Sequence, residues 1–195
     1  MKQPINPKRM NNNIIQMGTH GNEERQVNDL YCTPPKALEK LLENEQFDNI
    51  IWECADGLGH ISSILKERGY LVKRSDIVQY LGDTELIDFL QYSDKWEHDI
   101  ITNPPYKLAT EFINKGLEII EDGHKIAMYL KINFLASNKR KDLFNNNPPK
   151  VIYVICKRLS CAKNGDFIQY NNGSVDYCWI VWEKGYKGNT IIKWI

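Results

Sequence analysis

The sequence predicts an α/β domain built around a mostly parallel β-sheet, and two features of the chain support this prediction. Short apolar runs typical of buried strands alternate with amphipathic segments of helical period, which is the pattern of parallel strands covered on both faces by helices. The last two apolar runs, at residues 151–156 and 177–182, have no predicted helix between them. We therefore expect an antiparallel hairpin to close the sheet.

The expected strands are six apolar runs, at residues 49–54, 70–77, 99–102, 125–130, 151–156 and 177–182. A first amphipathic helix opens in the segment 31–35, where Thr33 is the expected N-cap and the prolines suit the first turn. The other expected helices cover residues 60–68, 108–120 and 137–144, and 83–92 is expected to be a short helix or turn. Gly69 is the expected stop of the second helix.

The first 28 residues are polar and lack hydrophobic periodicity, so we predict a flexible N-terminal arm at 1–28. Residues 29–195 are predicted to form a single domain with no separate target-recognition domain. No segment approaches the roughly 20 apolar residues that cross a bilayer, and the arm lacks the apolar stretch of a secretory signal. We therefore expect a cytoplasmic protein with no membrane partner.

The 5 cysteines and 4 histidines indicate neither a disulfide framework nor a metal site. The number of cysteines is odd, and no two of them have the CxxC spacing common among zinc ligands. We interpret the cysteines as small core residues of a protein in a reducing compartment.

The 25 basic and 25 acidic residues give a formal net charge of zero, but they are unevenly distributed. Nine basic residues and one acid lie between Lys125 and Lys163, whereas acids dominate between Met17 and His60. The basic stretch is either a solvated face or a surface for a polyanion such as nucleic acid. Charge alone does not separate these two interpretations.

A glycine-containing loop, ECADGLG at residues 53–59, follows the first predicted strand. Gly57 and Gly59 permit positive φ and a close approach of the backbone to a ligand, although ordinary tight turns also use this pattern. Asp76 ends the next predicted strand about 20 residues later, where a carboxylate can accept both ribose hydroxyls of an adenosine. Because Glu53 and Asp56 would repel phosphate, the loop suits a cofactor with a positive centre.

Two neighbouring residues could complete an adenosine site. Asp88 could accept a hydrogen bond from the adenine amino group, and Phe89 could cover the ring. A surface acid beside a core aromatic residue would give the same sequence, and this simpler interpretation stays open.

The tetrapeptide Asn103-Pro104-Pro105-Tyr106 follows the third predicted strand and has the composition expected for methylation of an exocyclic amine. The lone pair of such an amine is delocalised, so two acceptors aimed at its N–H groups favour the tetrahedral form that attacks a methyl group. Asn103 offers its side-chain oxygen and Pro104 its main-chain carbonyl. The two prolines make the turn rigid, and preorganised acceptors need no reorganisation during the reaction. Tyr106 offers a ring on which a flat base could stack.

A second Asn-Pro-Pro, at residues 147–149, provides an internal comparison. It follows a predicted helix rather than a strand and continues into Lys150 without an aromatic residue. We interpret it as a helix stop and turn.

Together these residues resemble the amino-methyltransferases that carry Asn-Pro-Pro-Tyr, most closely the small N6-adenine DNA methyltransferases of phages and prophages. Residues 29–35 (DLYCTPP) are similar to the upstream Tyr-x-Thr-Pro motif of that family. Residues 53–59 are similar to its Glu-Pro-x-x-Gly-x-Gly loop, and residues 99–106 (DIITNPPY) to its Asp-Ile-Ile-x-Asn-Pro-Pro-Tyr. The chain departs from the family at Cys54, where proline is usual, which we expect to change loop rigidity rather than chemistry.

The resemblance implies a Rossmann-like class I methyltransferase fold, with a mostly parallel seven-stranded sheet and an antiparallel C-terminal strand. It implies S-adenosyl-L-methionine as the methyl donor, no metal, and direct transfer at Asn103, Pro104, Pro105 and Tyr106. The residues expected to bind this cofactor are Tyr31, Thr33, Pro34, Glu53, Ala55, Gly57, Gly59, Asp76, Ile77, Asp88, Phe89 and Asn103.

The resemblance also implies a nucleic acid partner, DNA in the first instance, in a bacterial or phage-infected cell. The basic residues expected to contact it are Lys107, Lys139, Arg140, Lys157, Arg158 and Lys163. Methylation of RNA, of a guanine amino group or of a protein glutamine uses the same tetrapeptide, and a non-catalytic nucleotide- or DNA-binding module is a further alternative. The upstream Tyr31 to Pro34 segment favours adenine.

Overall fold

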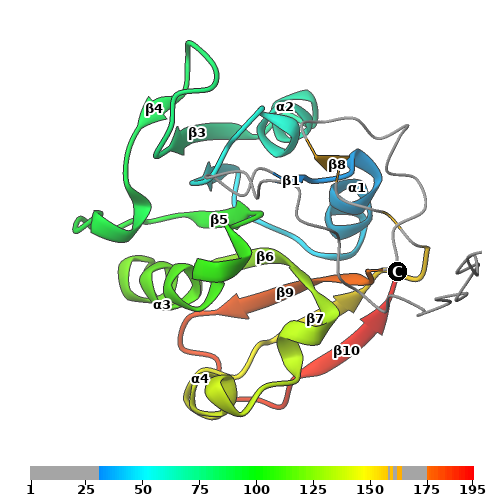
Figure 1. The fold of residues 1–195 in the computed structure, drawn as a ribbon. Helices are drawn as coiled ribbons and strands as arrows, with labels where there is room; N and C mark the ends of the chain where they lie inside the picture. Colours follow the sequence, from blue (N-terminus) through cyan, green and yellow to red (C-terminus); the bar gives the residue numbers. More distant parts are fainter. Residues whose placement is uncertain (1–30, 158, 160–161, 164–174) are drawn as a thin grey trace, which may run out of the picture.

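The computed structural model describes residues 31–157, 159, 162–163 and 175–195, and within them eight strands form one sheet (Figure 1). The order across the sheet is β10-β7-β9-β6-β5-β2-β3-β4. The strands are β2 (Ile50–Glu53), β3 (Leu71–Asp76), β4 (Glu85–Leu86), β5 (Asp99–Thr102), β6 (Lys125–Lys131), β7 (Val151–Val154), β9 (Tyr177–Glu183) and β10 (Ile191–Trp194). The fold is therefore α/β with a mostly parallel sheet, which confirms the predicted fold class.

One strand, β9, runs against the others. It pairs antiparallel with β6 over seven residues and antiparallel with β7 on its other side, so it lies inside the sheet rather than at its edge. The predicted C-terminal hairpin is thus confirmed. The described sheet has eight strands rather than the predicted seven, because β4 and β10 lie outside the six apolar runs recognised in the sequence. The two residues of β4 carry too little periodicity to be recognised.

Four α-helices cover the two faces of the sheet in the described part of the chain. They are α1 (Pro35–Asn44), α2 (His60–Glu67), α3 (Ala109–Ile119) and α4 (Lys141–Asn146). α1 and α2 pack on one face through a core that includes Leu38, Leu41 and Leu65, and α3 and α4 pack on the other through Phe112 and Leu143. Successive strand residues point to opposite faces, so Ile51 belongs to the first core and Trp52 to the second.

The first helix begins differently from the prediction. Pro34 is the residue that precedes the helix, and Pro35 occupies its first turn, as expected for proline. The prediction that Thr33 is the N-cap is wrong. Its hydroxyl makes no capping bond, because Thr33 lies one residue too early, next to the extended Tyr31–Cys32 segment. The second helix ends as predicted: Gly69 follows it with a φ of 90°, a conformation that favours glycine.

A two-stranded antiparallel sheet lies apart from the main sheet. β1 (Tyr31–Cys32) pairs with β8 (Ala162–Lys163), with Tyr31 opposite Lys163 and Cys32 opposite Ala162. β1 leads directly into α1, and the indole N–H of Trp179 on β9 donates to the carbonyl of Ala37 at 2.8 Å. The Trp179 contact connects the first turn of α1 to the central sheet.

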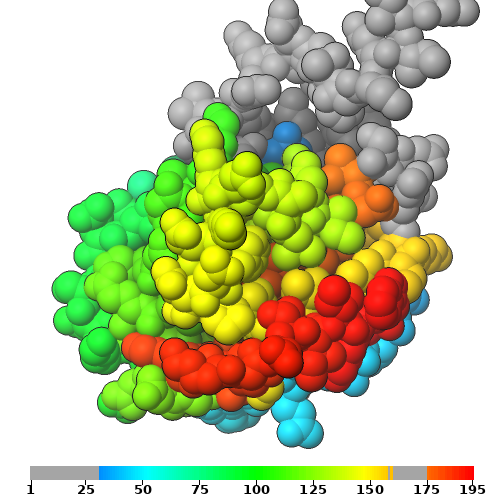
Figure 2. Space-filling model, turned by 90° about the horizontal axis from the view of Figure 1, so that it is seen from below, coloured from blue at the N-terminus to red at the C-terminus, as the bar shows by residue number. Residues whose placement is uncertain are grey.

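The edge of the main sheet formed by β10 is exposed. Figure 2 shows the red C-terminal residues at the surface. In β10, the exposed fractions are 50% for Ile191, 49% for Ile192 and 69% for Trp194. No helix of the described residues is long and apolar enough to cross a membrane. The predicted arm at 1–28 lies outside the described residues, and the prediction of a single domain over 29–195 stays a prediction.

Candidate active site

A cavity of about 480 Å³ opens at the carboxyl edge of the parallel strands β2, β3 and β5. This edge is where open α/β sheets commonly bind ligands, and the volume lies in the range of small-molecule sites. The cavity is lined by residues from five separate segments of the chain. The predicted site residues among them are Tyr31, Thr33, Glu53, Ala55, Gly57, Asp76, Ile77, Asp88, Phe89, Asn103, Pro105 and Lys107.

Four of the predicted catalytic and cofactor-binding residues are not part of the described cavity wall: Pro34, Gly59, Pro104 and Tyr106. Pro34 and Gly59 precede α1 and α2, so they shape the wall without forming it. A Cβ on Gly59 would lie 3.0 Å from the Leu81 side chain and 3.2 Å from that of Arg74, and its φ is 75°. Glycine is therefore required at position 59 for both conformation and space.

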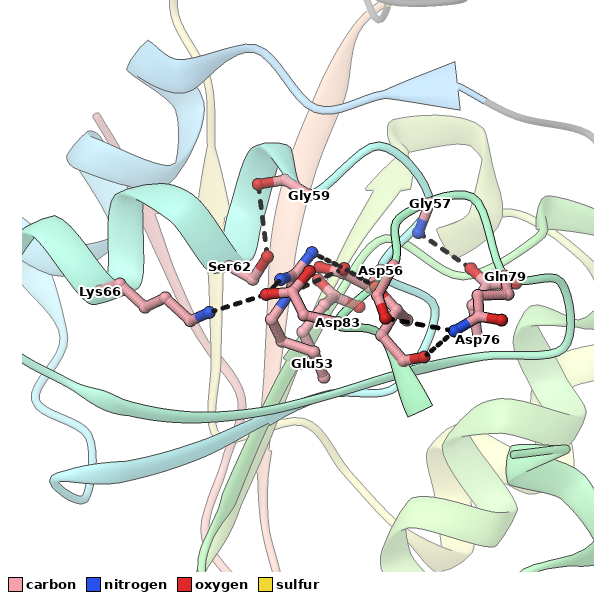
Figure 3. Close-up of polar contacts among 12 residues, drawn as sticks. Glu53, Asp56, Gly57, Gly59, Ser62, Lys66, Asp76, Gln79 and Asp83 are labelled. Carbon is pink, nitrogen blue, oxygen red and sulfur yellow. Dashed lines mark hydrogen bonds and ion pairs between the residues drawn. The ribbon is translucent and has the colours of Figure 1, made fainter. Parts of the chain in front are cut away.

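The loop between β2 and α2 is bound to the end of β3, as Figure 3 shows. Gly57 has a φ of 53°, and its N–H donates to Asp76 Oδ2 at 2.9 Å. The N–H of Asp56 donates to the carbonyl of Ser75 at 3.0 Å. The glycine pattern in the sequence thus corresponds to a loop with positive φ beside the cavity, as predicted.

Asp76 already accepts two main-chain hydrogen bonds. Its Oδ1 accepts from the N–H of Val78 at 3.0 Å, and Oδ2 accepts from Gly57. Burial raises the pKa of the Asp76 carboxyl above its ordinary value, while these N–H donors act in the opposite direction. Each carboxylate oxygen has more than one lone pair, so Asp76 keeps acceptor capacity toward the cavity that it lines.

Glu53 is fully enclosed at the end of β2, with 1% of its surface exposed. Its Oε1 accepts from Thr102 Oγ1 at 2.5 Å and from the N–H of Ala55 at 3.0 Å. Burial raises the pKa of the Glu53 carboxyl well above its ordinary value, and the nearby charge of Asp56 raises it further. The neutral form of Glu53 is therefore favoured relative to an exposed glutamate.

The charge of Asp56 is paired within the protein through Oδ2, which corrects one argument from the sequence, whereas its Oδ1 is buried without a hydrogen-bond partner among the described residues. The Nη2 and Nε atoms of Arg74 donate to Asp56 Oδ2 at 2.7 and 2.9 Å, and Arg74 also pairs with Asp83. Thr84 Oγ1 donates to the same Asp56 oxygen at 3.2 Å. The sequence analysis missed Arg74, which is positioned by the pairing of β2 with β3, where Arg74 lies opposite Glu53.

The residues after β3 that were predicted to bind adenosine line the same cavity. Asp88 Oδ1 accepts from the N–H of Leu90 at 3.0 Å and caps the 3-10 helix η1 (Phe89–Gln91). Phe89 is 2% exposed and meets Trp52 edge to face at 5.3 Å, so most of its ring belongs to the core. Ile77 is 63% exposed beside Asp76. The Asp88-Phe89 pair thus has structural contacts and also lines the cavity, and its role in binding adenine stays a prediction.

Asn103 directly follows β5, and the two polar atoms of its side chain have different environments. Its Nδ2 donates to the main-chain carbonyl of Tyr31 at 2.7 Å. Its Oδ1 is buried and has no hydrogen-bond partner among the described residues, and the same holds for Thr33 Oγ1. Both residues line the cavity. Buried polar atoms are rarely left unsatisfied, so these two atoms indicate a ligand with complementary polar groups.

Tyr106 begins the 3-10 helix η2 (Tyr106–Leu108) beside the cavity and lies among other aromatic rings. It stacks with Tyr31 at a centroid distance of 5.9 Å and an interplanar angle of 25°. The centre of the Tyr177 ring lies 6.2 Å from that of the Tyr106 ring, and the Lys131 ammonium lies 4.9 Å from the centre of the Tyr106 ring. Lys131 and Tyr177 were not predicted as neighbours. They reach Tyr106 because they lie opposite each other on β6 and β9.

The predicted basic residues fall into different environments. Lys107 lines the cavity, and Lys139 and Lys157 are exposed. Arg140 donates through Nε to the carbonyl of Phe134 at 2.7 Å, so part of its guanidinium is used within the protein. Lys163 lies in β8, and Arg158 lies outside the described residues. Contact with nucleic acid stays a prediction for all of them.

The second Asn-Pro-Pro has the structural role that its context predicts. Asn147 follows the last residue of α4, and its carbonyl accepts from the indole N–H of Trp182 at 3.0 Å. It lies next to a different cavity from that of Asn103. The interpretation as a helix stop is confirmed.

Several cavity residues were not identified in the sequence, including His60, Ile61, Tyr80, Ile87, Leu108 and Phe112. His60 is the first residue of α2, and burial lowers the pKa of its imidazole. Its position directly after Gly59 is the feature of the sequence from which His60 could have been predicted to line the cavity. Within the described part of the chain, no group of three or more His, Cys, Asp or Glu residues is arranged to hold a metal ion.

The strand order, the helices on both faces and the loop after β2 form a Rossmann-like fold, which this chain shares with solved class I S-adenosylmethionine-dependent methyltransferases. The sequence matches no protein-family model and shows no significant similarity to a curated protein. Its fold is shared with a predicted O-methyltransferase from Agrobacterium tumefaciens, at a TM-score of 0.59 and 14% identity over 82% of this chain and 85% of that one.

Two further solved structures have the same fold. One is an S-adenosylmethionine-dependent O-methyltransferase from Thermotoga maritima, at a TM-score of 0.53 and 12% identity over 80% of this chain and 66% of that one. The other is the type IIG restriction endonuclease BpuSI, at a TM-score of 0.53 and 14% identity over 79% of this chain and 24% of that one. At such low identities, the likeness establishes the fold.

Proposed function

We propose that the protein transfers a methyl group from S-adenosyl-L-methionine to an exocyclic amino group, and that this group is N6 of adenine in DNA. The cavity at the carboxyl edge of the sheet would hold the cofactor, and Asn103 to Tyr106 would receive the target base beside it. The proposal requires no metal.

The cavity residues fit the chemistry of this cofactor. Asp76 would accept from its ribose hydroxyls, and Asp88 would accept from its adenine amino group through the oxygen not used by Leu90. Glu53 would provide negative charge for its cationic methionine end, and Gly57 leaves room for it at the loop. Thr33 Oγ1 gains the partner that it lacks in the protein alone. When bound, the cofactor supplies an electrophilic methyl group.

The single observation that carries the proposal is the buried, unpaired Asn103 Oδ1 at the wall of the cavity. An acceptor in this position is unsatisfied until a donor arrives, and an exocyclic amine has two N–H donors. A hydrogen bond from the amine to Asn103 withdraws its lone pair from conjugation and favours attack on the methyl group. The Pro104 carbonyl is the second acceptor in the proposal, and Pro104 and Pro105 limit the motion of both.

Aromatic rings beside the acceptor support a flat target. Tyr106 and Tyr31 stack on each other next to Asn103, which gives a base an apolar platform. A base in a duplex reaches such a platform only after rotation out of the stack. Because adenine has both a flat ring and an exocyclic amine, it satisfies the platform and the acceptor together.

The choice of DNA rests on the motif resemblance and on charge. The exposed Lys139 and Lys157 belong to the basic stretch of the C-terminal half, which suits contact with phosphates. BpuSI, a restriction endonuclease, has the same fold over part of its length. The segment from Tyr31 to Pro34, similar to the upstream motif of adenine methyltransferases, favours adenine over guanine or glutamine.

The proposal is tested by calorimetry and by transfer of labelled methyl groups. We expect wild-type protein to bind S-adenosylmethionine and to label unmethylated DNA. Asn103→Ala should lose at least 100-fold in transfer rate, the size seen when one preorganised hydrogen-bonding group is removed. A folded wild type that does not bind the cofactor would indicate a non-catalytic module. Labelling of RNA or protein but not of DNA would contradict the proposed substrate.

A further inference from the structure

The orientation of the Asn103 amide is set by a group outside the Asn-Pro-Pro-Tyr tetrapeptide. A main-chain carbonyl can only accept hydrogen bonds, and the Tyr31 carbonyl lies 2.7 Å from Asn103 Nδ2. The amide therefore turns its NH₂ group to Tyr31 and its oxygen away from it. That oxygen is the buried, unpaired atom at the cavity wall.

The Tyr31 carbonyl is held in place from several sides. Tyr31 is paired in β1 with β8, and its ring stacks on Tyr106. The next two residues, Cys32 and Thr33, are buried with 5% and 3% exposure. On the other side, Asn103 is followed by two prolines that restrict its backbone. Neither partner of the 2.7 Å hydrogen bond can therefore move away at low cost.

We propose that Tyr31 is a positioning residue whose main-chain carbonyl makes this site require an amide, and not a carboxylate, at position 103. This inference rests on the proposed function, because it assigns Asn103 Oδ1 to the target amine. An amide donates to Tyr31 and accepts from the amine at every pH. A carboxylate has no proton to donate, so it places an oxygen against the Tyr31 carbonyl and loses the fixed orientation.

A protonated carboxyl group would restore both roles. Its O–H would donate to the Tyr31 carbonyl, and its C=O would accept from the target amine. Asn103→Asp is therefore expected to be an acid-activated enzyme, whereas wild type is not. The charged groups that line the same cavity include four acids and two bases: Glu53, Asp56, Asp76, Asp88, His60 and Lys107.

The test compares Asn103→Asp with wild type across pH 5.5 to 8.5. The ratio of their transfer rates should rise about tenfold for each unit by which pH falls, until the introduced carboxyl is protonated. Asn147→Asp, the same change in the second Asn-Pro-Pro, is the matched control and should give a ratio that does not depend on pH.

A second measurement does not depend on catalysis. Titration of the introduced carboxyl by ¹³C NMR should give a pKa above the ordinary value of about 3.9 for aspartate. A pKa at or below that value would overturn the inference, as would an Asn103→Asp enzyme with wild-type rates or with a pH-independent loss. If wild type transfers no methyl group to any substrate, the proposed function fails, and the NMR titration still decides whether Tyr31 demands a donor.

Discussion

At the scale of single residues, Glu53 has an environment that suits a ligand better than it suits the empty protein. It is buried beside the charge of Asp56, and two donors, Thr102 and Ala55, share one of its oxygens. Such a carboxyl destabilises the fold when it ionises without a cation nearby. A positively charged ligand in the cavity would reverse this effect.

We expect Glu53→Gln to raise the stability of the protein without cofactor and to weaken cofactor binding. The folded-state pKa of Glu53 lies above its unfolded value, so the carboxyl contributes a cost that appears as pH rises above about 4.3 and grows up to the folded pKa. The gap in melting temperature between Glu53→Gln and wild type should therefore widen from pH 5 to pH 8.

Thermal melts at several pH values check this expectation. Glu67→Gln, a change at an exposed position of α2, is the control and should give a gap that does not vary with pH. If Glu53→Gln and Glu67→Gln behaved alike, the buried carboxyl would not have the environment described above.

Residue types and spacing were enough to predict most cavity residues, because the loop after β2, Asp76 and Asn103 all follow predicted strands. The sequence could not predict the partner of Asp56, since Arg74 reaches it only through the register of β2 and β3. Nor could it predict that Asn103 bonds to Tyr31, which lies 72 residues earlier in the chain.

At the scale of elements, Arg74 holds the β2–α2 loop against the segment that follows β3. The side chain of Asp56 is fully buried and that of Arg74 is 8% exposed, so each would be costly without the other. Figure 3 shows the loop, with Asp56 and Gly57, beside Asp76 and Asp83. This ion pair therefore fixes the shape of the cavity wall formed by the β2–α2 loop.

Arg74→Met should lower the free energy of unfolding by roughly 3–5 kcal/mol, because it leaves Asp56 buried without its cation. Urea denaturation measures this change. Arg68→Met is the matched control, since Arg68 and Glu39 are 3.9 Å apart and both partly exposed, and it should cost less than about 1 kcal/mol. Adding Asp56→Asn to Arg74→Met should recover part of the loss, and a further loss instead would contradict this account.

The helices and long strands were predicted because their periodicity extends over several turns or residue pairs. The two-residue strands β1 and β8 were not, although they hold Tyr31 beside the active site. Their pairing depends on the tertiary structure, which brings residues 31–32 and 162–163 together across most of the chain. The prediction of Thr33 as the N-cap was wrong for a related reason, because the extended β1 segment places the helix start one residue later.

At the scale of the whole molecule, the sheet brings the residues predicted to bind the cofactor and Asn103 to one edge. β2, β3 and β5 are adjacent and parallel, so Glu53, Asp76 and Asn103 end their strands side by side. The antiparallel β9 brings Tyr177 to the same region, next to Tyr106. The fold class followed from the alternation of apolar runs and helices. The substrate depends instead on a few side chains at this edge.

The most direct test of the central claim is to identify the nucleosides of unmethylated DNA after incubation with the protein and S-adenosylmethionine. We predict N6-methyladenine with wild type and none above background with Asn103→Ala. Methylation at a carbon, at an exocyclic oxygen or at a ring nitrogen, or an equal yield of N6-methyladenine from Asn103→Ala, would contradict the assignment of Asn103 as the acceptor for an exocyclic amine.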